Sequence, residues 1–218
     1  MSKYKNIIWD MDGTLLNTLD DLTDSVNAAL AEFHLPAKSK SEIRSYIGNG
    51  ILRLVELSVP NGRQEPQFQR IFTFFKNHYS KNCYHKTKPY DGLQNILAQL
   101  KAQGYRMAIV SNKADSEVKR LAQLYFKDAI RIATGEAAEI RKKPAPDMVL
   151  EAMRLLDANR ETTVYIGDSE VDLATAQNTD IDCLSVSWGF RDKQDLQAAG
   201  AKLIFNTPTE LAKYLGCG

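Results

Sequence analysis

The chain has 218 residues, of which 44% are hydrophobic and 25% charged, with 28 basic residues against 27 acidic ones. This length suits one large domain, or a core domain with a smaller one, and the composition is that of a globular protein. The net charge of +1 gives no electrostatic reason to expect nucleic acid or a membrane as partner. No apolar stretch is long enough for a signal peptide or a membrane span. We expect a cytoplasmic protein that is either a monomer or a homodimer.

Short apolar runs rich in β-branched residues alternate with helical stretches along most of the chain. The expected strands are Tyr4 to Trp9, Arg106 to Val110, Ile130 to Ala133, Thr163 to Ile166, Cys183 to Ser187 and Leu203 to Phe205. Strands that alternate with helices predict a parallel sheet covered by helices on both faces. The fold class expected is therefore α/β.

The alternation is interrupted between residues 17 and 87, where the periodicity is helical throughout. Leu19, Leu22 and Val26 begin one amphipathic face, and a capping box is expected from Ser39 to Glu42. We therefore divide the chain into an α/β core, residues 1–16 and 88–218, and a small all-helical domain, residues 17–87, inserted after the first strand.

Two aspartates follow the first expected strand. Asp10 and Asp12 are two residues apart, so in an extended chain both carboxylates point into one pocket. Their repulsion raises one pKa unless a cation lies beside them, so a metal could keep Asp10 ionised as a nucleophile while Asp12 holds a proton as general acid. Gly13 permits a tight turn and a close backbone approach to an oxyanion. The alternative is a loop of acidic turn residues that only caps the next helix.

A second pair of aspartates follows the fourth expected strand. Asp168 and Asp172 lie one helical turn apart, so both can face the same site. Hard carboxylate oxygens without competing nitrogen or sulfur ligands suit Mg²⁺. For Asp172, a charge that stabilises the first turn of a helix is the competing interpretation.

Cationic and hydrogen-bonding candidates lie at two further strand ends. Lys142 and Lys143 precede a proline-rich segment, and a lysine held there could neutralise a phosphate or the attacking carboxylate, while the other lysine of the pair is surface. Ser111 and Asn112 follow the second strand and can donate hydrogen bonds to phosphate oxygens. Their alternative role is a helix cap.

Four segments in this order resemble the motifs of the haloacid dehalogenase superfamily, and together they span residues 7 to about 176. They are Asp10-Met11-Asp12-Gly13-Thr14-Leu15-Leu16, Ser111-Asn112-Lys113, Lys143-Pro144-Ala145-Pro146-Asp147 and Gly167-Asp168-Ser169-Glu170-Val171-Asp172. The resemblance implies a Rossmann-like core with a helical cap domain, and a phosphatase branch because Asp12 is retained. The segments 27–30, 46–50 and 186–191 are most similar to phosphoglycolate phosphatases, although Asn17 stands where the family often has aspartate.

The resemblance also implies a role for each motif residue. Asp10 would attack phosphorus to form an aspartyl-phosphate, and Asp12 would protonate the leaving oxygen and then activate water. Mg²⁺ would be held by Asp10, the backbone carbonyl of Asp12, and Asp168, with Asp172 in support. The expected phosphate-binding residues are Gly13, Thr14, Ser111, Asn112 and Lys143, with Ser111 and Lys143 also counted as catalytic.

The expected function is hydrolysis of a small phosphorylated metabolite, phosphoglycolate first. An inorganic pyrophosphatase or a sugar-phosphate mutase would use the same core, because the inserted domain selects substrate and admits or excludes water. A module that binds phosphate ligands without turnover is the alternative of another class. Such a module has little need of the general acid at Asp12.

Overall fold

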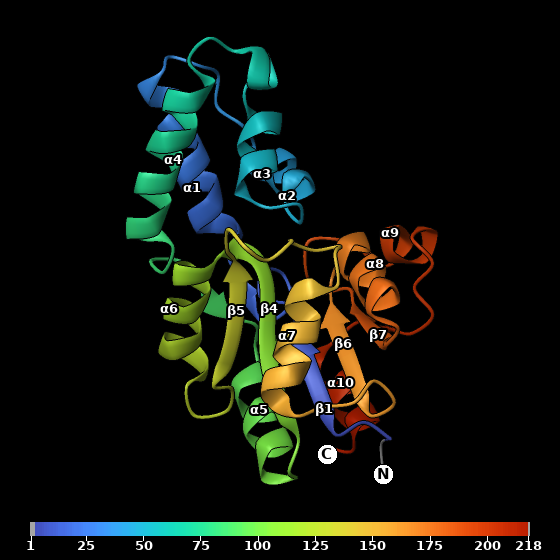
Figure 1. Ribbon diagram of the computed structural model, residues 1–218. Coiled ribbons are helices and arrows are strands. Elements are labelled where there is room, and N and C mark those ends of the chain that lie inside the picture. Colours follow the sequence, from blue (N-terminus) through green and yellow to red (C-terminus); the bar gives the residue numbers. More distant parts are fainter. Residues whose placement is uncertain (1–2, 218) are drawn as a thin grey trace. The chain divides into compact units, whose positions relative to one another are not determined.

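The computed structural model describes residues 3–217 and shows a chain built of two compact units (Figure 1). One unit contains the chain up to Leu16 and the chain from Pro89 onward, and the other is Asn17–Lys88. No helix within residues 3–217 combines the length and the apolar character needed to cross a bilayer.

A six-stranded sheet forms the centre of the first unit, in the order β5-β4-β1-β6-β7-β8. Its strands are β1 (Asn6–Trp9), β4 (Arg106–Ala114), β5 (Ile132–Glu136), β6 (Thr163–Gly167), β7 (Asp182–Val186) and β8 (Ile204–Phe205). All neighbouring pairs are parallel. The order runs outward from β1 through β4 and β5, then resumes with β6 on the other side of β1. Ligands in open α/β sheets bind at such a reversal, which here lies between β1 and β6.

The predicted α/β class with a Rossmann-like core is confirmed, and all six predicted strands are present. Their bounds differ from the sequence prediction, most of all at the second and third strands. The third strand was expected at residues 130–133 but occupies Ile132–Glu136. It is an edge strand with mostly half-buried residues, so its apolar pattern is weak. The second strand continues past Val110 to Ala114, with a bulge between these residues, so its last residues are extended although they are polar.

Helices of the first unit cover the sheet through apolar faces. They are α5 (Leu93–Ala102), α6 (Asp115–Phe126), α7 (Asp147–Leu156), α8 (Glu170–Thr179), α9 (Lys193–Ala198) and α10 (Pro208–Leu215). One buried cluster joins α7 and α8 to the sheet residues Ile8, Ala108, Val110 and Tyr165. Alternate strand residues point to the same face, so Tyr165 lies on the α7 side of the sheet.

The second unit is built of helices, as the periodicity of residues 17–87 predicts. They are α1 (Leu19–Glu32), α2 (Lys40–Tyr46), α3 (Ile51–Ser58), a 3-10 turn (Gly62–Gln64) and α4 (Phe68–Asn82). The capping box expected at Ser39 and Glu42 is present, with both reciprocal hydrogen bonds. The chain enters and leaves this unit through β2 (Leu16–Asn17) and β3 (Lys88–Pro89), which pair with each other. Strands of two residues have no periodicity, which is why the sequence does not reveal them.

Candidate active site

Asp10 lies at the carboxyl end of β1, beside the reversal point of the sheet. Trp9 pairs with Ile109 on one side and with Ile166 on the other, so the next residue emerges between β4 and β6. The amide of Asp10 donates to the carbonyl of Ile166 at 2.8 Å, and the residue is 6% exposed. Its backbone is therefore held by the sheet, with the side chain in a buried position.

A lysine lies between two of the candidate carboxylates. Lys143 Nζ donates to Asp10 Oδ1 at 2.6 Å and to Asp172 Oδ1 at 2.8 Å, and it is 3% exposed. Oxygen atoms of Asp10, Asp168 and Asp172 all lie within 4.8 Å of one another. The three carboxylates predicted from the first and fourth motifs thus converge, and Lys143 is the member of the 142–143 pair that bonds to two of them. Lys142 is half-buried.

Both oxygens of Asp172 have hydrogen-bond donors from the protein. Oδ2 accepts from the Ser169 amide at 3.1 Å and from the Ser169 hydroxyl at 2.6 Å. Oδ1 accepts from Lys143 and from the Tyr165 hydroxyl, which is 3.2 Å away. Asp172 therefore combines the two roles considered from the sequence, since it caps the first turn of α8 and also faces the site. By contrast, no described residue hydrogen-bonds Oδ2 of Asp10, so this oxygen is available to react.

Asp12 forms an ion pair with a different lysine. Lys113 Nζ lies 3.2 Å from Asp12 Oδ1, and the Lys113 side chain is 2% exposed. Asp12 is half-buried and is absent from the cluster of three converging carboxylates. Lys113 belongs to the second motif, but the sequence assigns it no role. Only its burial beside Asp12 marks it as a member of the site.

The loop after β1 packs tightly around Asp168. Gly13 has φ +88°, and a Cβ built on it would lie 2.2 Å from Asp168 Oδ2, so only glycine fits here. The Thr14 hydroxyl donates to Asp168 Oδ1 at 3.4 Å, and the Phe190 amide donates to Oδ2 at 2.6 Å. Thr14, expected to bind phosphate, thus has Asp168 as the partner of its side chain. A Cβ on Gly189 would lie 2.3 Å from Asp168 Oδ2, so the 189–190 segment fits closely against this carboxylate.

Ser111 and Asn112 are buried in the last part of β4. The Ser111 hydroxyl accepts from the Lys113 amide at 3.3 Å. The Asn112 side chain donates to the Lys143 carbonyl at 3.0 Å and accepts from the Lys143 amide at 2.8 Å. Neither side chain caps α6, whose N-cap is Ala114. Asn112 instead fixes the backbone of Lys143, a partner that sequence spacing cannot reveal because 31 residues separate the two.

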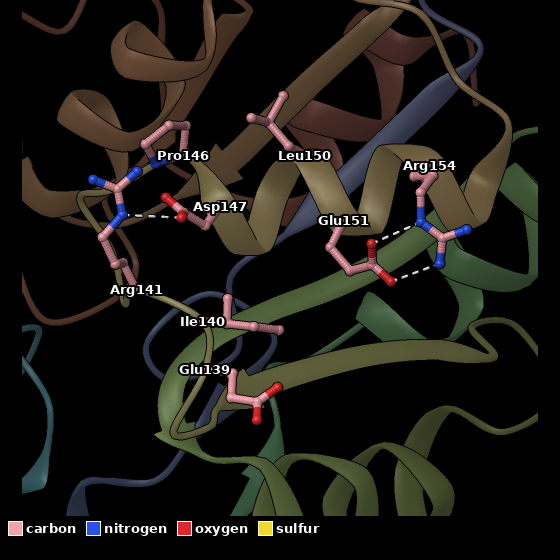
Figure 2. Close-up of a pocket in the computed structure, with 8 residues that line it drawn as sticks. All are labelled: Glu139, Ile140, Arg141, Pro146, Asp147, Leu150, Glu151 and Arg154. Carbon is pink, nitrogen blue, oxygen red and sulfur yellow. Dashed lines mark hydrogen bonds and ion pairs between the residues drawn. The ribbon is translucent and has the colours of Figure 1, made fainter.

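The loop that carries Lys143 is also held from the side of α7. Arg141 Nε donates to Asp147 Oδ1 at 2.9 Å, which ties the loop to the first turn of this helix (Figure 2). Asn178 of α8 donates to the Pro144 carbonyl at 2.8 Å. Arg141 and Asp147 also line an open surface cavity of about 440 Å³ beside α7. Because the loop has hydrogen-bond partners on β4, α7 and α8, the backbone of Lys143 is fixed, and its ammonium group has a defined position.

Burial and mutual repulsion set the protonation of these carboxylates. Burial raises the pKa of Asp10 well above its usual value although the nearby Lys143 opposes the shift, and Asp172 and Asp168 add to it. Burial and then the charge of Asp172 raise the pKa of Asp168 to about 7. Burial alone would lower the pKa of Lys143, but the charges of Asp10 and Asp172 outweigh it and raise that pKa. The lysine stays charged, whereas the carboxylates need more positive charge to ionise fully.

The donor set fits a divalent metal ion. Asp10, Asp12, Asp168 and Asp172 bring four carboxylates to the site, against the two ammonium groups of Lys113 and Lys143. With all four carboxylates ionised, two negative charges remain, and the converging atoms are hard carboxylate oxygens, which Mg²⁺ prefers. Asp10 and Asp168 would supply ligand oxygens. Asp172 already has four hydrogen-bond donors, so its contribution is the charge that it adds beside them.

The fold and the site together define an α/β enzyme, and comparison with known proteins shows its family. The family model described as haloacid dehalogenase-like hydrolase matches residues 7–186. The phosphoglycolate phosphatase of Psychrobacter arcticus is 31% identical over 96% of this chain and 94% of its own. The N-acetylmuramic acid 6-phosphate phosphatase of Pseudomonas aeruginosa is 26% identical over 98% of this chain and 95% of its own. A crystal structure from Lactobacillus delbrueckii subsp. bulgaricus, 34% identical, superposes with a TM-score of 0.92 over 97% of this chain and 98% of that one.

The chain belongs to the haloacid dehalogenase-like hydrolase family. Within this family it is a phosphatase, and the resemblance drawn from the four motifs is confirmed.

Proposed function

We propose that this phosphatase hydrolyses a small phosphomonoester through a phosphorylated Asp10, and that its substrate is phosphoglycolate. The observation that carries the proposal is the position of Asp10, whose Oδ1 is held by Lys143 at 2.6 Å while no described residue hydrogen-bonds its Oδ2. An oxygen with a fixed direction and no competing donor is suited to attack phosphorus. The similarity to the phosphoglycolate phosphatase of Psychrobacter arcticus supports the choice of substrate.

Each residue of the site has a distinct task in this proposal. Asp10 forms the bond to phosphorus as the bond to the leaving oxygen breaks, and Asp12 donates the proton that this oxygen needs. Asp12 then takes a proton from the water that hydrolyses the aspartyl-phosphate. Lys143 stabilises the negative charge of the transferring phosphoryl group, mainly by position and charge. Asp172 keeps Lys143 in place, and Asp168 helps to form the cation site.

We propose Mg²⁺ as the cofactor, held by Asp10, Asp168 and the backbone carbonyl of Asp12. When bound, it supplies the positive charge that neutralises phosphate oxygens. We also propose that the unit Asn17–Lys88 is a cap domain that selects the substrate. We propose that the reaction takes place in the cytoplasm, whose reducing environment suits the cysteine thiols of Cys83, Cys183 and Cys217.

The response of thermal stability to Mg²⁺ and pH tests the cation site. Because the folded pKa of Asp168 is about 7 and its ordinary value is 3.8, the folded state keeps this proton longer than the unfolded state. The contribution of Asp168 to metal-free stability therefore falls as pH rises from about 4 to about 7, then stays level. Metal competes with the proton, so we expect Mg²⁺ to raise the melting temperature more at pH 8 than at pH 5.5. Asp168→Asn should remove most of this difference, and an equal Mg²⁺ effect at both pH values would contradict the prediction.

A panel of phosphorylated compounds tests the reaction and its substrate. It should contain phosphoglycolate, N-acetylmuramic acid 6-phosphate, glucose 1-phosphate and inorganic pyrophosphate, each assayed for phosphate release with Mg²⁺ and with EDTA. We expect the highest kcat/KM for phosphoglycolate and no release in EDTA. Isomerisation of the sugar phosphate without phosphate release would point to a mutase. Tight binding without turnover of any compound would point to a module that only binds phosphate ligands.

A further inference from the structure

Tyr165 is a buried phenol beside the catalytic lysine that none of the four motifs contains. It lies in the middle of β6 on the α7 side of the sheet and is fully buried. Its hydroxyl accepts from Lys143 Nζ at 3.0 Å and lies 3.2 Å from Asp172 Oδ1, with the Val110 carbonyl at 3.4 Å. A buried hydroxyl inside a cluster of charges has a larger effect than one in an apolar core, because its dipole is poorly screened.

The hydrogen-bond geometry gives this hydroxyl one consistent orientation. Lys143 has three N–H donors, and Asp10, Asp172 and Tyr165 are three acceptors for them. Since the Tyr165 oxygen accepts from Lys143, its single hydrogen is left for Asp172 or Val110. The carboxylate is nearer and charged, so it is the preferred acceptor.

We propose that Tyr165 is a positioning residue, whose hydroxyl fixes the Lys143 ammonium and the Asp172 carboxylate so that Lys143 stays aligned on Asp10. With an acceptor for each of its three N–H groups, the ammonium group is held against rotation and against a shift toward Asp172. Without the hydroxyl, one N–H loses its partner, and two carboxylates alone compete for the cation. Alignment of Lys143 would then vary, and stabilisation of the phosphoryl group would weaken. The catalytic part of this inference rests on the proposed phosphatase mechanism.

The test compares Tyr165→Phe with Tyr4→Phe. Tyr165→Phe removes only the hydroxyl, and the ring stays in the apolar cluster, 5.6 Å from Lys143 Nζ. Tyr4 is a matched control, because it is also buried in this unit and donates its hydroxyl to a carboxylate, that of Asp182 at 2.9 Å. We expect kcat to fall about 10- to 100-fold in Tyr165→Phe, which is the effect of losing a hydrogen bond to a charged group, with KM changed less than about threefold. Tyr4→Phe should keep kcat within about twofold.

Two further measurements separate positioning from a general structural effect. In a Lys143→Met background, Tyr165→Phe should cost no further activity beyond about twofold, because its target is already absent. In protein labelled with ¹⁵N at lysine Nζ, the signal of the Lys143 ammonium group is assigned by its loss in Lys143→Met. The rate at which this group exchanges its hydrogens with solvent should be at least about tenfold higher in Tyr165→Phe. The same signal should be unchanged in Tyr4→Phe.

The outcomes distinguish this inference from the proposed reaction. A kcat within about twofold of wild type in Tyr165→Phe, an effect confined to KM, or losses that multiply in the double variant would overturn the positioning role. If the wild-type enzyme hydrolysed no phosphomonoester, the proposed reaction would fail, and the ¹⁵N measurement would decide alone. Faster exchange would then support the role of Tyr165 in holding Lys143, and unchanged exchange would reject it.

Discussion

Asp10→Asn is expected to abolish phosphate release, with a fall in kcat of about 10⁴-fold or more, because the amide cannot form the phosphorylated intermediate. The amide is nearly isosteric with the carboxylate. Burial raises the pKa of Asp10, which means that the folded protein bears a cost for the ionised carboxylate that the neutral amide does not bear. Lys143 keeps Asp172 as a charged partner in this variant, so we expect a melting temperature in EDTA close to that of wild type. Loss of activity with retained stability would assign the defect to chemistry.

Phosphate release and thermal unfolding, measured on the same preparations, check this result. Asp182→Asn is the matched control, since Asp182 belongs to the same unit but pairs with Lys3 at its exposed surface. It should keep full activity. Asp10→Ala excludes activity regained by deamidation of the new asparagine. Turnover by Asp10→Asn and Asp10→Ala at more than about 1% of the wild-type rate would reject Asp10 as the nucleophile.

Lys143→Met should be damaging to both activity and stability. The ammonium group is 3% exposed and bonds to Asp10 and Asp172, so its removal leaves buried carboxylates without their cation. Removing one partner of a buried ion pair costs about 3–5 kcal/mol, which corresponds to a fall in melting temperature of about 6–20 °C for a chain of this length. Loss of one preorganised charge at the phosphoryl group should reduce kcat by about 10²- to 10³-fold.

Lys142→Met is the control for this variant, because it removes an adjacent lysine of the same loop that is only half-buried. It should keep kcat within about twofold and stability within about 1 kcal/mol. Added Mg²⁺ should restore part of the stability of Lys143→Met, since it brings positive charge to the same carboxylates. Equal effects of the two substitutions on kcat would contradict the role assigned to Lys143.

Much of the candidate site is predictable because it depends on strand ends. Asp10 and Asp168 follow β1 and β6, which are adjacent and parallel, so the two carboxylates meet once the strand order is known. The helical character of residues 17–87 is equally visible, because amphipathic helices repeat an apolar face every turn. The sequence does not predict the bounds of β5 or the two-residue strands β2 and β3. Edge strands and very short strands show little hydrophobic periodicity.

Other members of the site have no local signal. Tyr165 occupies a position that the sequence indicates only as part of an apolar strand, and its hydroxyl is significant because Lys143 and Asp172 arrive beside it. Asn112 is expected from its place in the chain to bind phosphate, yet its side-chain amide bonds to the backbone of Lys143. Lys113 becomes part of the site through burial beside Asp12.

The sequence by itself determined the α/β class, the helical insert and the aspartates of the first and fourth motifs, because strand and helix periodicity and residue order are local properties. Only the tertiary structure decided which lysine faces Asp10, which hydroxyl holds it, and which side chains are occupied in supporting others. These are contacts between residues tens of positions apart, and their energies depend on burial and on the direction of each hydrogen bond, neither of which a linear pattern contains.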